Sequence, residues 1–293
     1  MPSPQILFLI SPHSRGGEPV NDNALTLPKA FRDAGWQVSE AEHGSIHRTP
    51  AGLASNANPV SNFDLIWPVG FGPRNGFFDW LQLMSELPAR KVINAPAALA
   101  LKHGKAAWAE HCPDHHIAAD APTLISAMQA EPGDWVLKPL AGSFGEGVRR
   151  LRSDEAQTIT EAMSARPGEY FMLQRFLPAI AQGETRTLVV AGRQIGSYLR
   201  VPTDDLHANL AQQGRAEATS LSPGQSQLVG NIAQELTRQH IGFASIDTVG
   251  DTLMEVNIAN PGGLGTLGQL YGRDFGPALV RATESFIAEP LSR

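Results

Sequence analysis

The sequence contains a single cysteine, Cys112, and it has no long apolar run. One cysteine excludes an intrachain disulfide and indicates a reducing compartment. The apolar residues 6–10 have no Lys or Arg before them, and Ser11 and Pro12 end the run before it reaches the length of a signal-peptide core. No segment approaches the roughly 18 apolar residues that a membrane helix needs. We therefore expect a soluble cytoplasmic protein without a membrane partner.

Excess positive charge is also missing, because the formal net charge is −6 and the isoelectric point is about 5.8. This balance excludes a broad cationic surface for nucleic acid or anionic lipid, so any anion must be bound locally. With 42% apolar and 18% charged residues, the composition is typical of a globular enzyme. A chain of 293 residues has room for about two compact units, and one large or three small ones are also ordinary.

The first hundred residues alternate between strand and helix patterns. Strands are expected at residues 6–10, 64–67 and 91–93, and helices at 27–34, with Gly35 as the stop, and at 76–86. Such alternation predicts a small parallel sheet flanked by helices. The Ser, Asn, Pro and Gly content of residues 44–62 predicts a long surface loop.

After a helix that contains Lys105, the pattern changes toward paired strands. Strands are expected at residues 135–139, 148–151, 170–175, 185–191, 194–201, 243–249 and 253–258. Helices are expected at 153–165, 223–240 and 275–289, and a polar loop at 202–222. We see no internal repeat and no low-complexity tract.

Two lysines and a glycine-rich loop are suited to a polyphosphate. Lys138 ends a strand in which Val136 points to the same side, so its ammonium lies near buried surface and is expected to have an anionic partner. Gly142, Gly145 and Gly147 follow directly, and glycines let backbone N–H groups approach phosphate oxygens. An ordinary hairpin loop is the alternative interpretation of this segment.

The closing hairpin carries three oxygen-bearing side chains. Glu255 and Asn257 share one strand face, and Met254, Val256 and Ile258 share the other. Asp247 joins the polar face only if it lies opposite Glu255, which requires a three-residue loop of residues 250–252. Carboxylate and amide oxygens suit magnesium. A solvated edge hairpin is the alternative.

Three other motifs are weaker. Asp274, Phe275 and Gly276 spell the metal-binding triplet of protein kinases, but the chain ends 17 residues later and no catalytic loop precedes the triplet. Residues 111–116 include three histidines and a cysteine, but their spacing fits no standard zinc pattern, and a polar helix end explains them. Ser143 lacks the flanking glycines of a hydrolase nucleophile, so it is assigned to the glycine loop.

The order of these motifs resembles the ATP-grasp ligases, and among them the prokaryotic glutathione synthetases. The similarity covers about two hundred residues in order and spacing. Its motifs are Asn94-Ala-Pro96, Lys105, Lys138-Pro-Leu with the glycine loop, residues 173–180, 183–190 and 199–202, Ala208-Asn209-Leu-Ala211, Gly214-Arg215, Ile246-Asp247 and Glu255-Val-Asn257. The resemblance implies an α/β protein with the ATP-grasp fold. Its expected parts are an N-terminal α/β domain (1–103), a lid subdomain (104–180) and a larger antiparallel ATP-binding subdomain (181–293).

The resemblance also implies roles for individual residues. The ATP-binding set is Lys105, Lys138, Gly142, Ser143, Phe144, Gly145, Gly147, Gln174, Arg175, Phe176, Leu177 and Glu184; the segment 174–177 would line the adenine pocket and Glu184 would bond the ribose. The magnesium ligands, which could also hold manganese, are Asp247, Glu255 and Asn257. The residues near the acyl phosphate are Arg186, Arg200 and Asn209, and the substrate-binding set is Arg215, Asn260, Gly262 and Gly263.

The implied reaction joins a small carboxylate to an amine, with an acyl phosphate as intermediate and ADP and phosphate as products. Glutathione synthetase, which uses γ-glutamylcysteine and glycine, is the leading assignment, and a homo-oligomer (dimer or tetramer) is expected. The chain departs from the family pattern at residues 68–74, at Ala141 and at Phe144. Two alternatives therefore stay open: a ligase for another small acid or peptide, and a nucleotide-binding protein without turnover.

Overall fold

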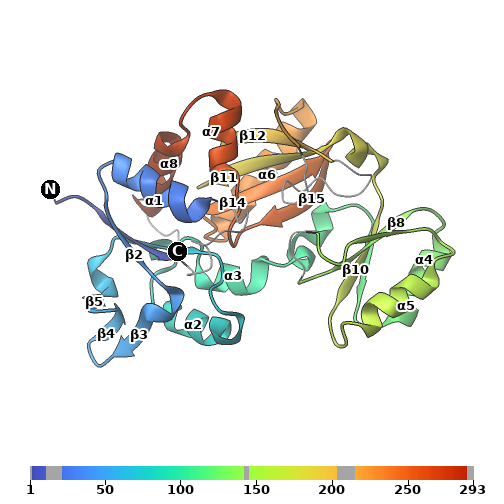
Figure 1. Cartoon of the computed structure of the whole chain (residues 1–293), viewed down its shortest axis with the longest axis horizontal. Helices are drawn as coiled ribbons and strands as arrows, with labels where there is room; N and C mark the ends of the chain where they lie inside the picture. Colours follow the sequence, from blue (N-terminus) through green and yellow to red (C-terminus); the bar gives the residue numbers. More distant parts are fainter. Residues whose placement is uncertain (1, 11–21, 142–144, 203–214, 289–293) are drawn as a thin grey trace.

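The computed structural model describes residues 2–10, 22–141, 145–202 and 215–288. Its N-terminal part contains a parallel sheet, as predicted, in which β1 (Gln5–Ile10) lies between β2 (Gln37–Ala41) and β6 (Leu65–Val69). Strand β2 was not predicted. The helices of this part are α1 (Asn23–Asp33), α2 (Phe77–Met84) and α3 (Pro96–Lys102) (Figure 1). Gly35 has a φ of +86°, a conformation in which glycine is not strained, and it lies directly after the end of α1, as predicted.

Two N-terminal expectations are wrong. Residues 44–62 form a small antiparallel sheet of β3 (Ile46–Thr49), β4 (Gly52–Ser55) and β5 (Asn58–Pro59), bordered by the 3-10 turns η2 (His43–Ser45) and η3 (Val60–Asn62). The sheet forms because Ile46, Leu53 and Val60 pack into the core between its polar turns. Residues 91–93 do not form a strand: η5 (Ala89–Lys91) precedes a single bridge from Val92 to Ile66.

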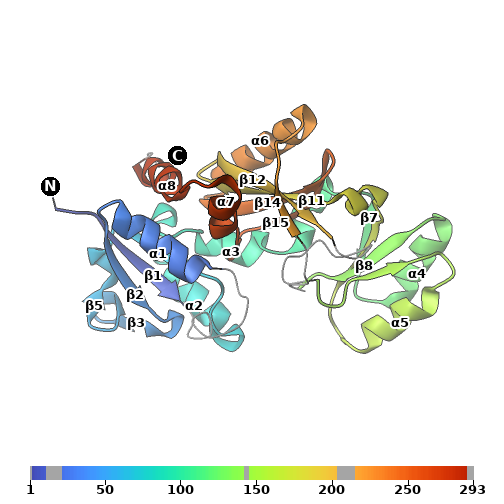
Figure 2. The same ribbon diagram turned by 45° about the horizontal axis from the view of Figure 1, so that its top comes forward.

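A second sheet is built from residues 115–175. Its order is β7-β10-β8-β9, with β7 (His115–Ala118), β8 (Trp135–Pro139), β9 (Arg149–Leu151) and β10 (Phe171–Arg175) antiparallel to their neighbours. The helices α4 (Ala121–Ala130) and α5 (Ala156–Ser164) cover one face, where Trp135, Leu137 and Leu173 are buried (Figure 2). Strand alternation places Lys138 and Gln174 on the other face. We call these strands the small sheet; β7 and α4 were not predicted.

The third sheet, here the large sheet, has the order β13-β12-β11-β14-β15 and is antiparallel throughout. Its strands are β11 (Glu184–Val190), β12 (Arg193–Val201), β13 (Arg215–Ala218), β14 (Phe243–Val249) and β15 (Thr252–Asn257). One face packs against α6 (Pro223–Arg238), and the other against α7 (Leu264–Tyr271) and α8 (Gly276–Ala288). The expected loop 202–222 thus contains an edge strand, β13, whose four residues Arg-Ala-Glu-Ala include no β-branched or aromatic side chain to indicate a strand. Helix α7 was also missed.

The N-terminal part is attached to the large sheet by buried asparagines. The side-chain amide of Asn94 donates to the carbonyl oxygens of Phe243 (2.7 Å) and Ile258 (2.6 Å), and its oxygen accepts from Phe243 N (2.8 Å). Asn23, at the start of α1, donates to Asn260 Oδ1 (2.8 Å) and Pro261 O (3.0 Å). Because a buried amide is costly unless it is hydrogen-bonded, these contacts fix the ends of β14 and β15 against the first sheet.

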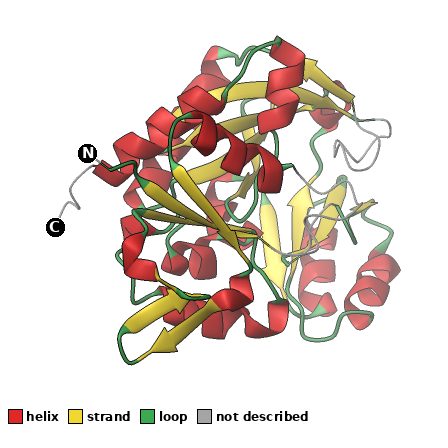
Figure 3. Cartoon of the chain, turned by 60° about the vertical axis from the view of Figure 1, so that its left-hand side comes forward, coloured by secondary structure: helices red, strands yellow, loops and turns green. Residues whose placement is uncertain are grey.

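Helices lie outside the sheets in all three parts, as Figure 3 shows by colour. The elements therefore form the mixed helix and sheet architecture that the sequence predicted. Within the described ranges, no helix combines the length and the apolar character needed to cross a bilayer.

Candidate active site

The β14–β15 hairpin places the three predicted metal ligands together, but not through the expected turn. Asp247 lies opposite Glu255, and Ser245 lies opposite Asn257, as the metal assignment requires. The expected three-residue loop is wrong, because Val249 pairs with Thr252 and the turn has two residues. A β-bulge between the 248–253 and 247–255 pairs adds one residue to β15 and restores the register.

The predicted position of Met254 is also wrong, because of the bulge. Its side chain was expected on the face of Val256, but it packs instead with Phe176, Leu177 and Ile180. Val256 belongs to the core beneath α6. Since a bulge re-aims one side chain, Met254 and Glu255 can follow each other in the sequence and both leave the α6 core.

Asp247 is fully buried and surrounded by cations. Arg186 donates from Nε to Oδ1 (2.8 Å) and from a terminal nitrogen to Oδ2 (2.6 Å), and Arg200 donates to Oδ2 (2.8 Å). Burial would raise the pKa of Asp247, but the two guanidinium groups lower it below its ordinary value. Arg200 also contacts Glu184 Oε2 at 2.7 Å, and burial raises the pKa of Glu184. These four groups form a buried, charge-balanced cluster, the Asp247 cluster.

Glu255 connects this cluster to the first lysine. Its Oε1 lies 3.3 Å from Lys105 Nζ, and Lys105 is the first residue of the 3-10 segment η6 (Lys105–His111). Asn257 donates its amide nitrogen to Asp247 Oδ2 (3.2 Å), which leaves the amide oxygen as a donor atom for a metal. Two carboxylates and one amide oxygen from paired strand positions fit magnesium, which prefers oxygen ligands.

Lys138 lies on the face of the small sheet opposite α4 and α5, and its ammonium donates to Gln174 Oε1. The expected anionic partner is therefore replaced by a neutral amide oxygen, although the negative charges of Glu255 and Glu184 also act on this lysine. Burial lowers the pKa of Lys138, because removal from water disfavours the charged form. Glu255 thus lies within electrostatic reach of both predicted ATP lysines.

The predicted glycine loop and adenine segment are partly described. Gly145 and Gly147 have φ values of +76° and +74°, and a Cβ at Gly147 would lie 3.0 Å from Pro139, so glycine is required there. Gly142, Ser143 and Phe144 lie outside the described residues. In the adenine segment, Phe176 N already donates to Asp134 O (3.0 Å).

The side chain of Arg175 lies away from the site: its guanidinium stacks over Trp135 at 3.9 Å and pairs with Glu131. Its predicted contribution to adenine binding is therefore limited to its backbone.

The predicted substrate residues are more dispersed. Arg215 is exposed on β13 and forms an ion pair with Glu217. Asn260 accepts the hydrogen bond from Asn23, and a Cβ at Gly263 would lie 3.0 Å from Tyr198. Gly262 lies between them, and Asn209 is outside the described residues. Their substrate roles remain predictions.

The residues 68–74, where the chain departs from the family pattern, lead from β6 into α2. The Phe71 ring lies 4.4 Å from that of His103 and 5.1 Å from that of Phe77, measured between centroids. His103 is two residues before Lys105. The loop thus presents an aromatic cluster of residues 71, 77 and 103 next to the segment that begins with Lys105.

Cys112 also lies at the site, which the sequence did not indicate. Its Sγ is 3.9 Å from Met254 O, and the charges of Lys138 and Glu255 influence it. Burial raises the pKa of the thiol to about 11. No spacing rule reveals this position, because Cys112 follows a 3-10 segment rather than an α-helix.

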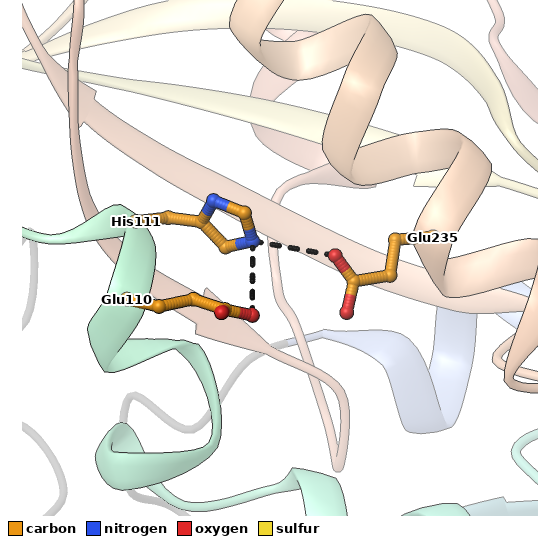
Figure 4. Close-up of side chains that lie close together, drawn as sticks. All are labelled: Glu110, His111 and Glu235. Atoms are coloured by element: carbon orange, nitrogen blue, oxygen red, sulfur yellow. Dashed lines mark hydrogen bonds and ion pairs between the residues drawn. The ribbon is translucent and has the colours of Figure 1, made fainter.

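The histidine motif of residues 111–116 is divided by the fold. His111 Nε2 lies 3.3 Å from Glu235 Oε2 and 3.6 Å from Glu110 Oε1, as Figure 4 shows, whereas His115 and His116 belong to β7. Glu110 is 74% exposed at its side chain, so polar contacts at the surface explain this group without a metal.

Comparison with known proteins decides the family. The model of the prokaryotic glutathione synthetase ATP-grasp domain matches residues 102–272, more than half of the chain. The chain belongs to the prokaryotic glutathione synthetase family. A glutathione synthetase of Parasynechococcus marenigrum (strain WH8102) is 28% identical, with 98% of this chain and 95% of the relative covered. One of Prochlorococcus marinus (strain MIT 9313) is 31% identical over 73% and 72%.

Solved structures confirm the fold. The ATP-grasp ligase PsnB, determined with a minimal precursor, Mg and ADP, superposes with a TM-score of 0.67 at 15% identity, covering 96% of this chain and 98% of PsnB. The family and the fold together identify an ATP-dependent ligase with the predicted ATP-grasp architecture.

Proposed function

We propose that the chain activates a small carboxylate with ATP and joins it to an amine, and that γ-glutamylcysteine and glycine are its substrates. The observation that carries the proposal is the position of Glu255, a metal-ligand candidate that contacts Lys105 at 3.3 Å and acts electrostatically on Lys138. Phosphate-binding cations and metal-binding oxygens therefore converge on one site, as phosphoryl transfer to an acid requires.

In this proposal, the site residues have the following roles. Lys105 and Lys138 bind ATP phosphates, while Asp247, Glu255 and Asn257 hold Mg²⁺, or Mn²⁺ in its place. The bound metal supplies positive charge that offsets repulsion between the phosphate and the attacking carboxylate. Without a ligand, the side chains of Lys105 and Arg186 neutralise Glu255 and Asp247.

Arg186 and Arg200 lie where they can stabilise negative charge on an acyl phosphate. Each is anchored by Asp247, so their guanidinium groups are oriented before the substrate arrives. The amine then attacks the acyl carbon and phosphate leaves. No covalent enzyme nucleophile is needed, and the raised pKa of Cys112 keeps the nearest thiol protonated at neutral pH.

A different acid substrate is the second candidate, and the aromatic cluster beside His103 favours it. Phe71 and Phe77 are partly buried apolar side chains near His103, two residues before Lys105, where a zwitterionic dipeptide would need polar partners. An acid with an apolar or aromatic side chain would match this surface better.

Release of ADP tests both candidates. With γ-glutamylcysteine, glycine, ATP and Mg²⁺, we expect ADP only when all are present. ADP release with apolar acids but not with the dipeptide would support the second candidate. Binding of ATP with no release for any acid and amine pair would show a nucleotide-binding protein without turnover and contradict the proposal.

Three further predictions belong to this proposal. The subdomain boundaries are expected near residues 103 and 180, the protein is expected in the cytoplasm, and a homo-oligomer is expected. Light scattering of the purified protein measures the last, and a monomeric mass would contradict it.

A further inference from the structure

The first turn of α6 is attached to the two strands that carry the Asp247 cluster. Ser222 caps the helix and Gln225 completes a capping box: Ser222 Oγ accepts from Gln225 N (3.0 Å), and Gln225 Oε1 accepts from Ser222 N (3.0 Å). A capping box needs only the oxygen of the glutamine amide. The nitrogen remains available for other contacts.

That nitrogen reaches across to the large sheet. Gln225 Nε2 donates to Thr185 Oγ1 on β11 (3.3 Å) and to Thr248 Oγ1 on β14 (3.2 Å). Gln225 is 9% exposed, Thr185 5% and Thr248 0%. One buried amide group therefore bonds a helix start and two adjacent strands, and loss of one member leaves buried polar atoms without partners.

The two threonines stand directly beside the metal site. Thr185 pairs with Thr248 in the register of β11 and β14, and the next pair along is Arg186 with Asp247. Since side chains alternate along a strand, the threonines face α6 and the Arg186–Asp247 pair faces the opposite side. A displacement of Thr248 relative to Thr185 would therefore also displace Asp247 relative to Arg186.

The same helix turn also contacts the turn of the β14–β15 hairpin, on the same side of the bulge as Thr248. Ser222 Oγ donates to Asp251 Oδ1 in the two-residue turn (2.6 Å). A Cβ at position 224 would lie 2.1 Å from Asp251 Oδ2, so only glycine permits this approach. The α6 start thus holds the hairpin at its turn and at Thr248, where the register shift begins.

We propose that Gln225, with Thr185 and Thr248, is a positioning residue of the metal site: it holds β14 against β11 in the register that places Asp247 beside Arg186. Ser222 holds the hairpin turn through Asp251, and the bulge in β15 then places Glu255 opposite Asp247. The inference rests on the proposed role of Asp247 and Glu255 as metal ligands.

The test is a Mg²⁺ titration of ATP binding by calorimetry. Gln225→Leu keeps most of the volume and removes both donors. We expect about a tenfold loss of apparent Mg²⁺ affinity, on the scale of about 10- to 100-fold seen when outer partners of metal ligands are removed. ATP binding measured without metal should change little, because both lysines lie on other segments.

Thr248 provides a matched pair that avoids changes in the helix. Thr248→Val removes the acceptor at nearly constant shape and should reproduce the Mg²⁺ defect, while Thr248→Ser keeps the acceptor and should restore affinity close to wild type. The double variant Gln225→Leu, Thr248→Val should be no worse than the poorer single variant, because both disrupt one group of hydrogen bonds.

Asp120→Ala is the control for the loss of a helix cap. Asp120 is the N-cap of α4, which covers the small sheet, and its side chain accepts a hydrogen bond from Thr123 N (2.9 Å). Loss of this cap should lower stability and leave the Mg²⁺ titration unchanged.

Wild-type Mg²⁺ affinity in Thr248→Val, or in a folded Gln225→Leu variant, would overturn the inference and leave the proposed function intact. ATP binding by the wild type that ignores Mg²⁺ would instead overturn the proposed metal site itself.

Discussion

Charged side chains have different kinds of partner on the large sheet and on the small sheet, which both contribute to the candidate site. On the large sheet, Asp247 and Glu184 are paired with Arg186 and Arg200, so two negative and two positive charges cancel within the fold. On the small sheet, Lys138 donates to the neutral oxygen of Gln174, and its pKa is lowered by burial. The large-sheet cluster is therefore assembled before ligand binds, whereas Lys138 gains a strong partner only when an anion arrives.

The largest expected effect on turnover comes from removing a negative charge from the Asp247 cluster on the large sheet. Asp247→Asn should lower turnover by at least about 10²-fold, since it removes a metal ligand and the partner of two arginines. Thermal stability should also fall, because buried guanidinium groups lose a carboxylate. ADP release and a melting curve measure the two effects, with Asp154→Asn, an exposed carboxylate, as control. Turnover near wild type would contradict the assigned role of Asp247.

Replacement of Lys138, on the small sheet, should reduce function without unfolding the protein. Lys138→Ala should lose turnover and ATP affinity but remain folded, because a partly buried ammonium without a carboxylate contact adds little to stability. Calorimetry and circular dichroism measure these changes, with the exposed Lys29→Ala as control. Unfolding of Lys138→Ala at room temperature would show that this lysine is a structural residue.

The pH dependence of ATP binding sharpens the same contrast. The charged form of Lys138 binds phosphate, and its pKa lies below the ordinary 10.5, so ATP affinity should fall as pH rises, before an exposed lysine would lose its proton. Lys138→Arg keeps its charge to higher pH and should remove this decline. Dissociation constants between about pH 7 and 10 test this. Parallel curves for both proteins would contradict the assignment.

The smallest effect concerns the thiol between the two surfaces. With a pKa of about 11, Cys112 should react with iodoacetamide much more slowly at neutral pH than an exposed cysteine. Thr160→Cys in a Cys112→Ala background supplies that reference, because Thr160 is exposed on α5. Equal alkylation rates would show that Cys112 is neither buried nor desolvated.

The alternation of strands and helices predicted the parallel N-terminal sheet, and the family resemblance implied the ATP-grasp fold. The pairing of Asp247 with Glu255 followed only as a condition of the metal assignment, and the structure has it. The three-residue turn was wrong, because the protein achieves this pairing with a two-residue turn and a bulge in β15, a combination that the alternation of side chains along the hairpin did not indicate. The sequence also did not indicate that Lys138 has a neutral partner, since Gln174 is 36 residues away along the chain.

Other elements were missed because their stability comes from tertiary packing. The edge strand β13 has only two alanines as apolar residues, and the N-terminal sheet β3-β4-β5 depends on Ile46 and Leu53 reaching a core that is built mainly by other segments. A long polar and proline-containing segment still forms strands when a few apolar side chains can be buried.

The most direct test is a crystal structure with a non-hydrolysable ATP analogue and Mg²⁺, with Mn²⁺ substituted so that anomalous scattering locates the metal. We expect a metal at the terminal phosphates that is also held by oxygens of Asp247, Glu255 and Asn257, about 2.1 Å from each ligand for magnesium, with Lys105 and Lys138 on the phosphates. A nucleotide bound elsewhere, or a metal that contacts none of these three hairpin residues, would contradict the proposal.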